Sequence, residues 1–280
     1  MNPIMASADR RVPAPPAAIP TAYVGALLAG IGLCAAPTDA SVVAKASATI
    51  DWSSVRIQSA VVPANVWGPS QLMGLTQAFV EWNGASREDD ATFSSGHHAA
   101  AAVAELGGAR ALGMIHDSII FSDAWCLGPS STPFSGQAEA TSGMSWTLDR
   151  YLSPVVTAGP ILLSFTYDLG LEIKTEGPGD VASAAADITF SIAGGVTISG
   201  PPLSLVRSVG SGWDIGPIHQ SGTAVFRFTL PPPGLSSMQR YFRFDLAANA
   251  TTSAQSVPSA GAVATALAAL LVVGSRRRSR

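Results

Sequence analysis

The sequence predicts an all-β protein: an antiparallel β-sandwich, jelly-roll-like, with a C-terminal transmembrane helix. Residues 161–174 are the clearest strand: every second residue from Leu163 to Ile173 is apolar or aromatic, which is the period of a half-buried strand. Clusters of Gly and Pro, such as 177–179 and 231–234, separate similar stretches and are typical of turns. Helical periodicity is scarce between the two chain ends, so strands should fill the body.

The strand-like stretches can be followed along the chain in order. Residues 48–62 open with alternation and a phase slip near Ser53, which could be a bulge. Residues 63–96 are rich in turn formers and predict a loop with short strand pieces, whereas the Ala-rich residues 97–113 predict a short helix. The other expected strands cover 115–121, 123–127, 137–152, 161–174, 181–198, 203–206, 223–230 and 238–248.

The last 24 residues, 257–280, have the pattern of a membrane segment. Val257 to Ser275 contains no charge over 19 residues. As a helix this run would be about 28 Å long, close to the roughly 30 Å core of a bilayer. The run is followed by Arg276, Arg277, Arg278 and Arg280, which the positive-inside rule places in the cytoplasm. We therefore expect the body to lie outside the cytoplasm.

The first 46 residues have the features of an export signal. Arg10 and Arg11 supply positive charge, and residues 21–36 form a short apolar run. Small-residue cleavage patterns follow at Ala44–Ala46 and Ala46–Ala48. We therefore expect a leader at 1–46, a sandwich domain at 47–250, a linker at 251–256 and the tail at 257–280.

The charge of the body excludes one class of partner. Residues 47–256 carry 9 basic and 17 acidic side chains, a net charge of −8. A surface this acidic does not bind nucleic acid through phosphate neutralisation. The body also holds a single cysteine, Cys126, which excludes an internal disulfide and predicts a small buried side chain.

The order of the elements at the C-terminus resembles the PEP-CTERM sorting signal of exported bacterial proteins. Val257-Pro258 matches the start of that motif, and an apolar run and an arginine cluster follow; Ser259 and Ala260 stand where Glu and Pro are usual. The body pattern at 163–186 also looks like the sandwich cores of such proteins. The resemblance implies recognition by an exosortase and a place at the cell surface or in an exopolysaccharide matrix.

No catalytic motif or cofactor-binding motif is found, and we expect no enzyme activity, no cofactor and no metal site. Paired carboxylates on a sandwich could hydrolyse sugars; Glu139, Asp149, Asp168 and Glu172 lie on expected strands. The acidic run 87–90 predicts a solvated loop, with calcium binding as an alternative. His97, His98, His116 and His219 show no metal-ligand spacing. Exposed tryptophans could stack on sugars, although we expect most of Trp52, Trp67, Trp82, Trp125, Trp146 and Trp213 to be buried.

These observations favour an exported structural protein of the bacterial surface or matrix, delivered by its C-terminal signal. The membrane, through residues 257–280, is one expected partner; an exosortase and an extracellular polysaccharide are others. A carbohydrate-binding module on the same fold is the alternative, followed by a sandwich glycoside hydrolase.

Overall fold

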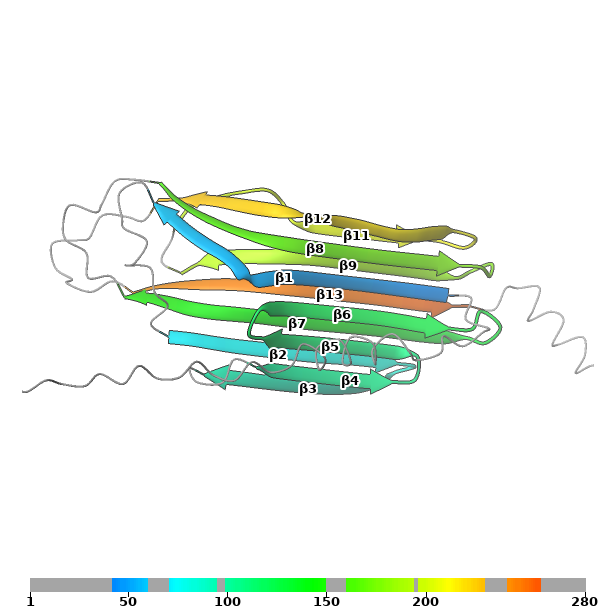
Figure 1. The fold of residues 1–280 in the computed structure, drawn as a ribbon. Helices are drawn as coiled ribbons and strands as arrows, with labels where there is room; N and C mark the ends of the chain where they lie inside the picture. Colours follow the sequence, from blue (N-terminus) through cyan, green and yellow to red (C-terminus); the bar gives the residue numbers. More distant parts are fainter. Residues whose placement is uncertain are drawn as a thin grey trace, which may run out of the picture. The chain divides into compact units, whose positions relative to one another are not determined.

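The computed structural model describes residues 42–59, 71–94, 99–149, 160–193, 196–229 and 241–257, and these residues form two antiparallel sheets. Figure 1 shows the strands running along one common direction in two layers. Sheet A has the spatial order β10 (Ile198–Ser199), β12 (Asp214–Phe228), β8 (Ile161–Thr175), β1 (Val42–Ser59), β6 (Ile119–Gly128), β5 (Ala109–His116), β4 (Ala100–Leu106). Sheet B has the order β11 (Ser204–Val209), β9 (Val181–Ile192), β13 (Tyr241–Ser256), β7 (Phe134–Asp149), β2 (Gln71–Trp82), β3 (Ala85–Ser94).

The predicted all-β class and the two-layer sandwich are confirmed. In β8, Leu163, Phe165, Leu169, Leu171 and Ile173 are buried, as the period of two in the sequence requires. In β9 the alternate residues Ala182, Ala184, Ala186, Ile188 and Ile192 are buried in the same way.

The first and last strands lie in the middle of the two sheets. β1 pairs with β6 and β8 in sheet A, and β13 pairs with β7 and β9 in sheet B. β1 also forms a Greek key with the meander β4–β5–β6, and each connection from β6 to β13 crosses from one sheet to the other. Val42, where β1 begins, and Ser256, where β13 ends, lie at the same end of the sandwich (Figure 1).

Two expected elements are wrong. The Ala-rich stretch 97–113 is no helix: residues 100–106 form β4 and residue 109 begins β5. Ala102 and Ala104 are buried while their neighbours are exposed, so burial against the opposite sheet overrides the helix propensity of alanine. The loop expected over 63–96 is a hairpin from residue 71 onward. Its turn, Asn83-Gly84, has positive φ at both residues, as a two-residue type I′ turn requires.

The expected domain boundaries also need correction. β1 begins at Val42, so the last residues assigned to the leader belong to the sandwich. Val42, Ala44 and Ala46 are buried and pair with both β6 and β8. The expected linker 251–256 is the end of β13, where Thr252 and Ala254 are buried. Small residues resembled a linker because this part of the core is built from small side chains.

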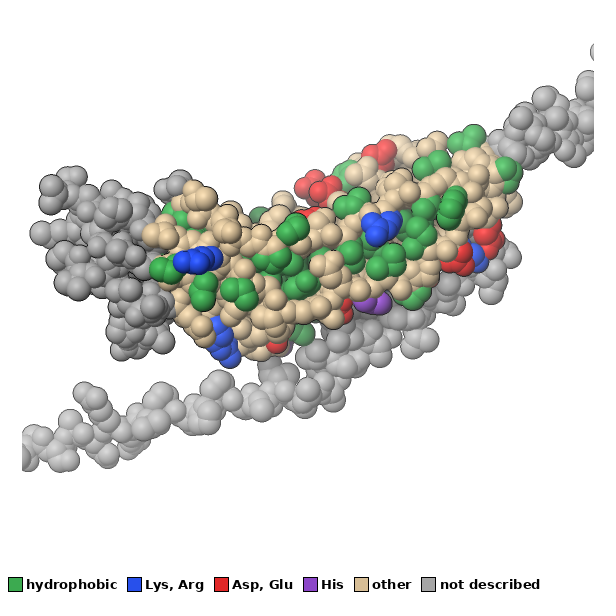
Figure 2. All heavy atoms as spheres, turned by 90° about the horizontal axis from the view of Figure 1, so that it is seen from above, with side chains coloured by type: hydrophobic (Ala, Val, Ile, Leu, Met, Phe, Trp, Pro, Cys, Tyr) green, Lys and Arg blue, Asp and Glu red, His purple; other side chains and the backbone are tan. Residues whose placement is uncertain are grey.

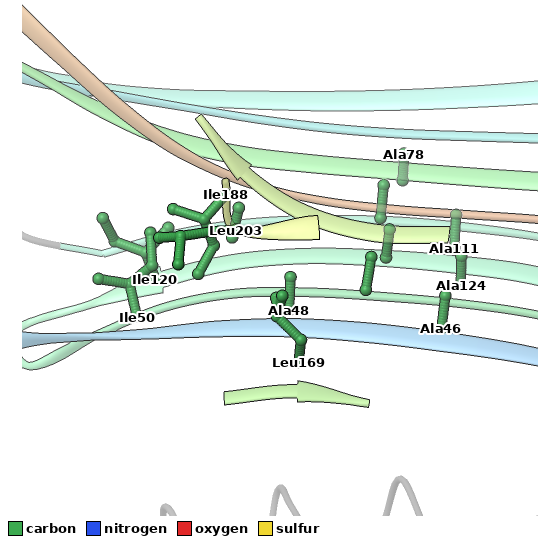
Figure 3. Packing of buried hydrophobic residues seen from close by; sticks show 14 of the residues in the cluster. Ala46, Ala48, Ile50, Ala78, Ala111, Ile120, Ala124, Leu169, Ile188 and Leu203 are labelled. Atoms are coloured by element: carbon green, nitrogen blue, oxygen red, sulfur yellow. The ribbon is translucent and has the colours of Figure 1, made fainter. Parts of the chain in front are cut away.

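The core divides into two parts along the strands. The part nearer Val42 and Ser256, which we call the small-residue half, contains buried alanines of β1, β6, β7, β9 and β13, whereas the opposite part, the aromatic end, is filled by large rings. Figure 3 shows Ala46, Ala78, Ala111 and Ala124 on one side and Ile50, Ile120, Ile188 and Leu203 on the other. The aromatic end contains Trp52, Trp146, Phe165, Phe190, Phe226, Phe228 and Phe244.

The backbones of the two sheets approach each other closely next to the alanines. Ser122 of β6 donates a hydrogen bond to the carbonyl of Ala248 in β13 (2.9 Å), and Ser142 of β7 donates one to the carbonyl of Phe121 in β6 (2.7 Å). A Cβ atom on Gly113 of β5 would lie 3.0 Å from the carbonyl oxygen of Thr141. The small residues here therefore permit direct hydrogen bonds between side chains of one sheet and the backbone of the other.

Candidate functional site

The residues predicted for sorting lie at and beyond the end of the last strand. Val257 directly follows β13 and is 48% exposed. Pro258 and the anchor residues Arg276, Arg277, Arg278 and Arg280 lie outside the described residues, so the sorting motif stays a prediction. Within the described ranges, no helix is long and apolar enough to cross a bilayer.

The candidate carboxylates are divided between the two outer faces of the sandwich. Asp168 and Glu172 are on β8 and point outward from sheet A, where Glu172 forms an ion pair with Lys45 on β1 (2.8 Å). Glu139 points outward from sheet B on β7. The core separates Glu139 from the other two, so they form no facing pair. The side chain of Asp149 lies outside the described residues.

The histidines and the cysteine do not converge. His219 Nδ1 lies 3.7 Å from a carboxylate oxygen of Asp168, and both side chains are exposed. Cys126 is fully buried, as predicted, and its sulfur lies 3.6 Å from the hydroxyl of Thr252; burial raises the pKa of this thiol to about 11. Among the described residues, no group of three His, Cys, Asp or Glu could hold a metal ion; His97 and His98 lie outside them.

Asp123 is the described carboxylate whose pKa is raised most clearly. It lies on β6 between Ser47 of β1 and Leu112 of β5. Burial raises its pKa to about 6, although the positive charges of Arg110 and Lys45 oppose this rise. Arg110 lies 6.0 Å from the ring centre of Trp125 on the same outer face. This group is ionisable near neutral pH, but no second carboxylate faces it among its strand partners.

The acidic run 87–90, predicted as a solvated loop, is part of the edge strand β3. Its four side chains are exposed, as expected, but the backbone is extended and paired with β2. A carboxylate oxygen of Asp89 accepts a hydrogen bond from the backbone N–H of Val103 in β4 (2.8 Å). Asp89 thus bonds to the neighbouring edge strand of sheet A, a contact that the sequence does not reveal.

The tryptophans are mostly used in packing, as predicted. Trp146 is buried, and Trp52 and Trp82 pack against the core, Trp82 stacking on Phe134 with ring centres 4.9 Å apart. Trp213 in the β11–β12 turn is 62% exposed. Trp125 lies on the outer face of sheet A, and Trp67 is outside the described residues.

The best candidate for a binding site is a shallow hollow on the outer face of sheet B. It has a volume of about 200 Å³ and is lined by Gln77, Ala78, Phe79, Glu88, Glu139 and Thr141. Phe79 on β2 is paired with Glu88 of β3 on one side and with Glu139 of β7 on the other. A half-buried ring between two carboxylates and an amide offers a stacking surface with acceptors on both sides, which is the chemistry of sugar recognition.

Most residues of this hollow are not indicated by the sequence. The sequence indicates Glu139 as a candidate carboxylate, but it predicts a loop over the range that holds Gln77, Phe79 and Glu88. The signal present in the sequence is the pair Asn83-Gly84, which is typical of a two-residue hairpin turn and follows the strand-forming residues Phe79, Val80 and Trp82.

Comparison with known proteins adds nothing to this picture. No protein-family model matches the chain, and no curated protein matches it.

Proposed function

We propose that this chain is an exported bacterial protein with a structural role at the cell surface or in an extracellular polysaccharide matrix, delivered by its C-terminal sorting signal. The observation that carries the proposal is the uncharged run 257–275 with the arginine cluster behind it, placed directly after the last core strand. In the proposal, residues 257–280 form the transmembrane helix and Val257-Pro258 is the start of an exosortase motif.

The arrangement of the chain ends supports this proposal. The leader precedes Val42 and the tail follows Ser256, and both strand ends lie at one end of the sandwich. A body attached in this way presents its opposite end to the surroundings. The jelly-roll-like classification is likewise a proposal, supported by the crossing of each connection from β6 to β13 between the sheets.

The test is the location and the mature C-terminus of the protein in its native host. Fractionation with intact-mass spectrometry should find the chain outside the cytoplasm, ending between Val257 and Ala260. Replacing Pro258 by Ala should block this processing, whereas Ser259→Ala should leave it unchanged, because Ser259 already departs from the motif. A chain that still ends at Arg280 and is found in the membrane fraction would refute processing by an exosortase. It would leave the proposal of a membrane-anchored surface protein in place. A full-length chain in the cytoplasm would refute the whole proposal.

A carbohydrate-binding module is the second candidate, and the hollow around Phe79 is the observation that favours it. A glycan array probed with the full-length chain should then show binding that is lost in Phe79→Ala. Leu75→Ala is the matched control, since Leu75 is 41% exposed on β2 but does not line the hollow. Silence of the array, or equal binding by both variants, would exclude this site.

A further inference from the structure

The two sides of the sandwich, where its sheets end, are built differently. On one side the edge strands are β3 and β4; on the other they are β11 and β12, with the two-residue strand β10 covering only Arg227 and Phe228 of β12. In the described part of the chain, no strand pairs with the outer edge of β12 from Ile218 to Phe226, nor with that of β11. Two strands on this side therefore offer backbone groups to a further strand.

The β3–β4 side is acidic. Arg87, Glu88, Asp89 and Asp90 on β3 and Glu105 on β4 give it a net charge of −3, and all five side chains are exposed. Charged side chains on an edge strand prevent pairing with a copy of the same edge, because like charges would face each other. They do not prevent pairing with an edge of opposite charge.

The β11–β12 side is uncharged to weakly basic. Arg207 and Arg227 are its basic residues and Asp214 its acid, and residues 218–226 hold no carboxylate. Large apolar side chains are exposed here: Val206 (57%), Val225 (46%) and Trp213 (62%). Figure 2 faces this side, with β11 and β12 uppermost in Figure 1, and shows apolar side chains along its length with few charges between them.

The strand directions make the two sides compatible. From β11 to β3 in sheet B there are five antiparallel pairings, so these two edge strands run in opposite directions. The same holds from β12 to β4 in sheet A. A second copy shifted sideways would therefore place β3 antiparallel to β11 and β4 antiparallel to β12. Continuing sheet A in this way requires the hydrogen bond from the backbone N–H of Val103 to Asp89 to be replaced by one to the second copy.

We propose that the β11–β12 side is a docking surface for the β3–β4 side of a second copy of this chain. The opposite charges favour this contact over pairing of identical sides, since β3 against β3 would bring carboxylates together and β11 against β11 would bring arginines together. Because the surfaces differ, the contact is heterologous and each added copy leaves a free side, so the product is an open filament. The twist of the sheets gives this filament a helical path. The inference does not depend on the proposed location of the protein.

The experiment uses the full-length chain, purified in mild detergent, with sedimentation velocity over a range of protein concentrations and electron microscopy of the largest species. Wild-type protein should form a ladder of oligomers that lengthens with concentration. Arg207→Glu/Arg227→Glu makes both sides acidic, and Glu88→Lys/Asp90→Lys makes both sides basic. Each double variant should remain monomeric alone, and an equimolar mixture of the two should assemble again. The matched control is Glu139→Lys, the same change on the inner strand β7, which should assemble like wild type.

The charge swaps also separate this contact from association through the apolar tail, because the tail is identical in all variants. A monomer at every concentration would overturn the proposal. So would assembly that stops at a dimer, which indicates pairing of identical sides. Oligomers that persist unchanged in both double variants, or a mixture that stays monomeric, would also overturn it.

Discussion

The two halves of the core are packed with different kinds of residue. In the small-residue half, β9 contributes buried alanines and lies against β8, which contributes buried leucines and isoleucines. The sheets are joined nearby by hydrogen bonds from Ser122 and Ser142. In the aromatic end, rings from both sheets interleave: Phe244 stacks on Trp146 (5.4 Å between centres) and packs against Phe228 (5.7 Å). Close backbone approach stabilises one half and large buried rings stabilise the other, so the two halves should tolerate opposite kinds of substitution.

The largest expected effect comes from removing the start of β1, which belongs to the small-residue half. A chain beginning at residue 47 lacks Val42, Ala44 and Ala46 together with their pairing on both sides, so it should fail to fold. A chain beginning at Val42 should fold like the full sequence. Circular dichroism and thermal unfolding of the two truncated chains compare them directly. Equal stability would show that the small-residue half does not need this strand end.

A cavity in the aromatic end should have the next largest effect. Phe244 is fully buried, and Phe244→Ala should lower the free energy of unfolding by about 3–5 kcal/mol. Denaturant titration measures the change. Phe244→Leu, which keeps most of the side-chain volume, is the matched variant. Its loss of unfolding free energy should be clearly smaller. A loss below about 1 kcal/mol for the alanine variant would mean that the rings repack and that this end is not the rigid part.

In the small-residue half, a larger side chain should destabilise the protein. Truncation is not informative there, because the buried side chains are already small. Gly113→Val places methyl groups against the carbonyl oxygens of Thr141 and Gln77, which a Cβ would already approach to 3.0 and 3.2 Å. We expect a loss of about 1–3 kcal/mol in a urea titration. Gly216→Val is the control, since no atom lies within 4 Å of a Cβ at that site. Similar losses for both variants would contradict the close approach of the sheets.

Removing one hydrogen bond between the sheets should have a smaller effect. Ser142→Ala deletes the bond to the carbonyl of Phe121 and should cost about 1 kcal/mol. Ser183, whose hydroxyl bonds to Ser253 on the exposed face of sheet B, provides the control, and Ser183→Ala should change stability by less than about 0.5 kcal/mol. If thermal unfolding shows the same loss of stability for both variants, the buried hydrogen bond contributes no more than the exposed one.

The smallest perturbation uses Cys126 as a reporter of the small-residue half. Burial raises the pKa of its thiol to about 11, so at pH 8 the group is protonated and shielded from reagents. In the chain that begins at Val42, which lacks Cys34, a thiol reagent should therefore modify Cys126 only as fast as the protein unfolds. Denaturant should accelerate the reaction to the rate of a free cysteine. Rapid modification under native conditions would show that this half opens independently of the aromatic end.

Alternation of side chains was sufficient to predict the all-β class and the strands β8 and β9, because one apolar face is visible in a single sequence. The Ala-rich sequence of the hairpin β4–β5 predicts a helix because alanine fits both structures, and only burial against the opposite sheet decides between them. The hollow at Phe79 could not be predicted, since it depends on the register that sets Phe79 beside Glu88 and Glu139. A single sequence does not specify such pairing between distant strands.

The central positions of β1 and β13 also determine when the protein can fold. Lys45 forms an ion pair with Glu172, 127 residues later in the sequence, and contacts between such distant residues make folding slow. Sheet B cannot close before β13 arrives, because β7 and β9 have no other partner between them. A chain emerging from synthesis or from a translocation pore therefore remains unfolded until nearly all of it is available. Because of this delay, the polypeptide could pass through a narrow channel in an unfolded state and fold afterwards in one late step.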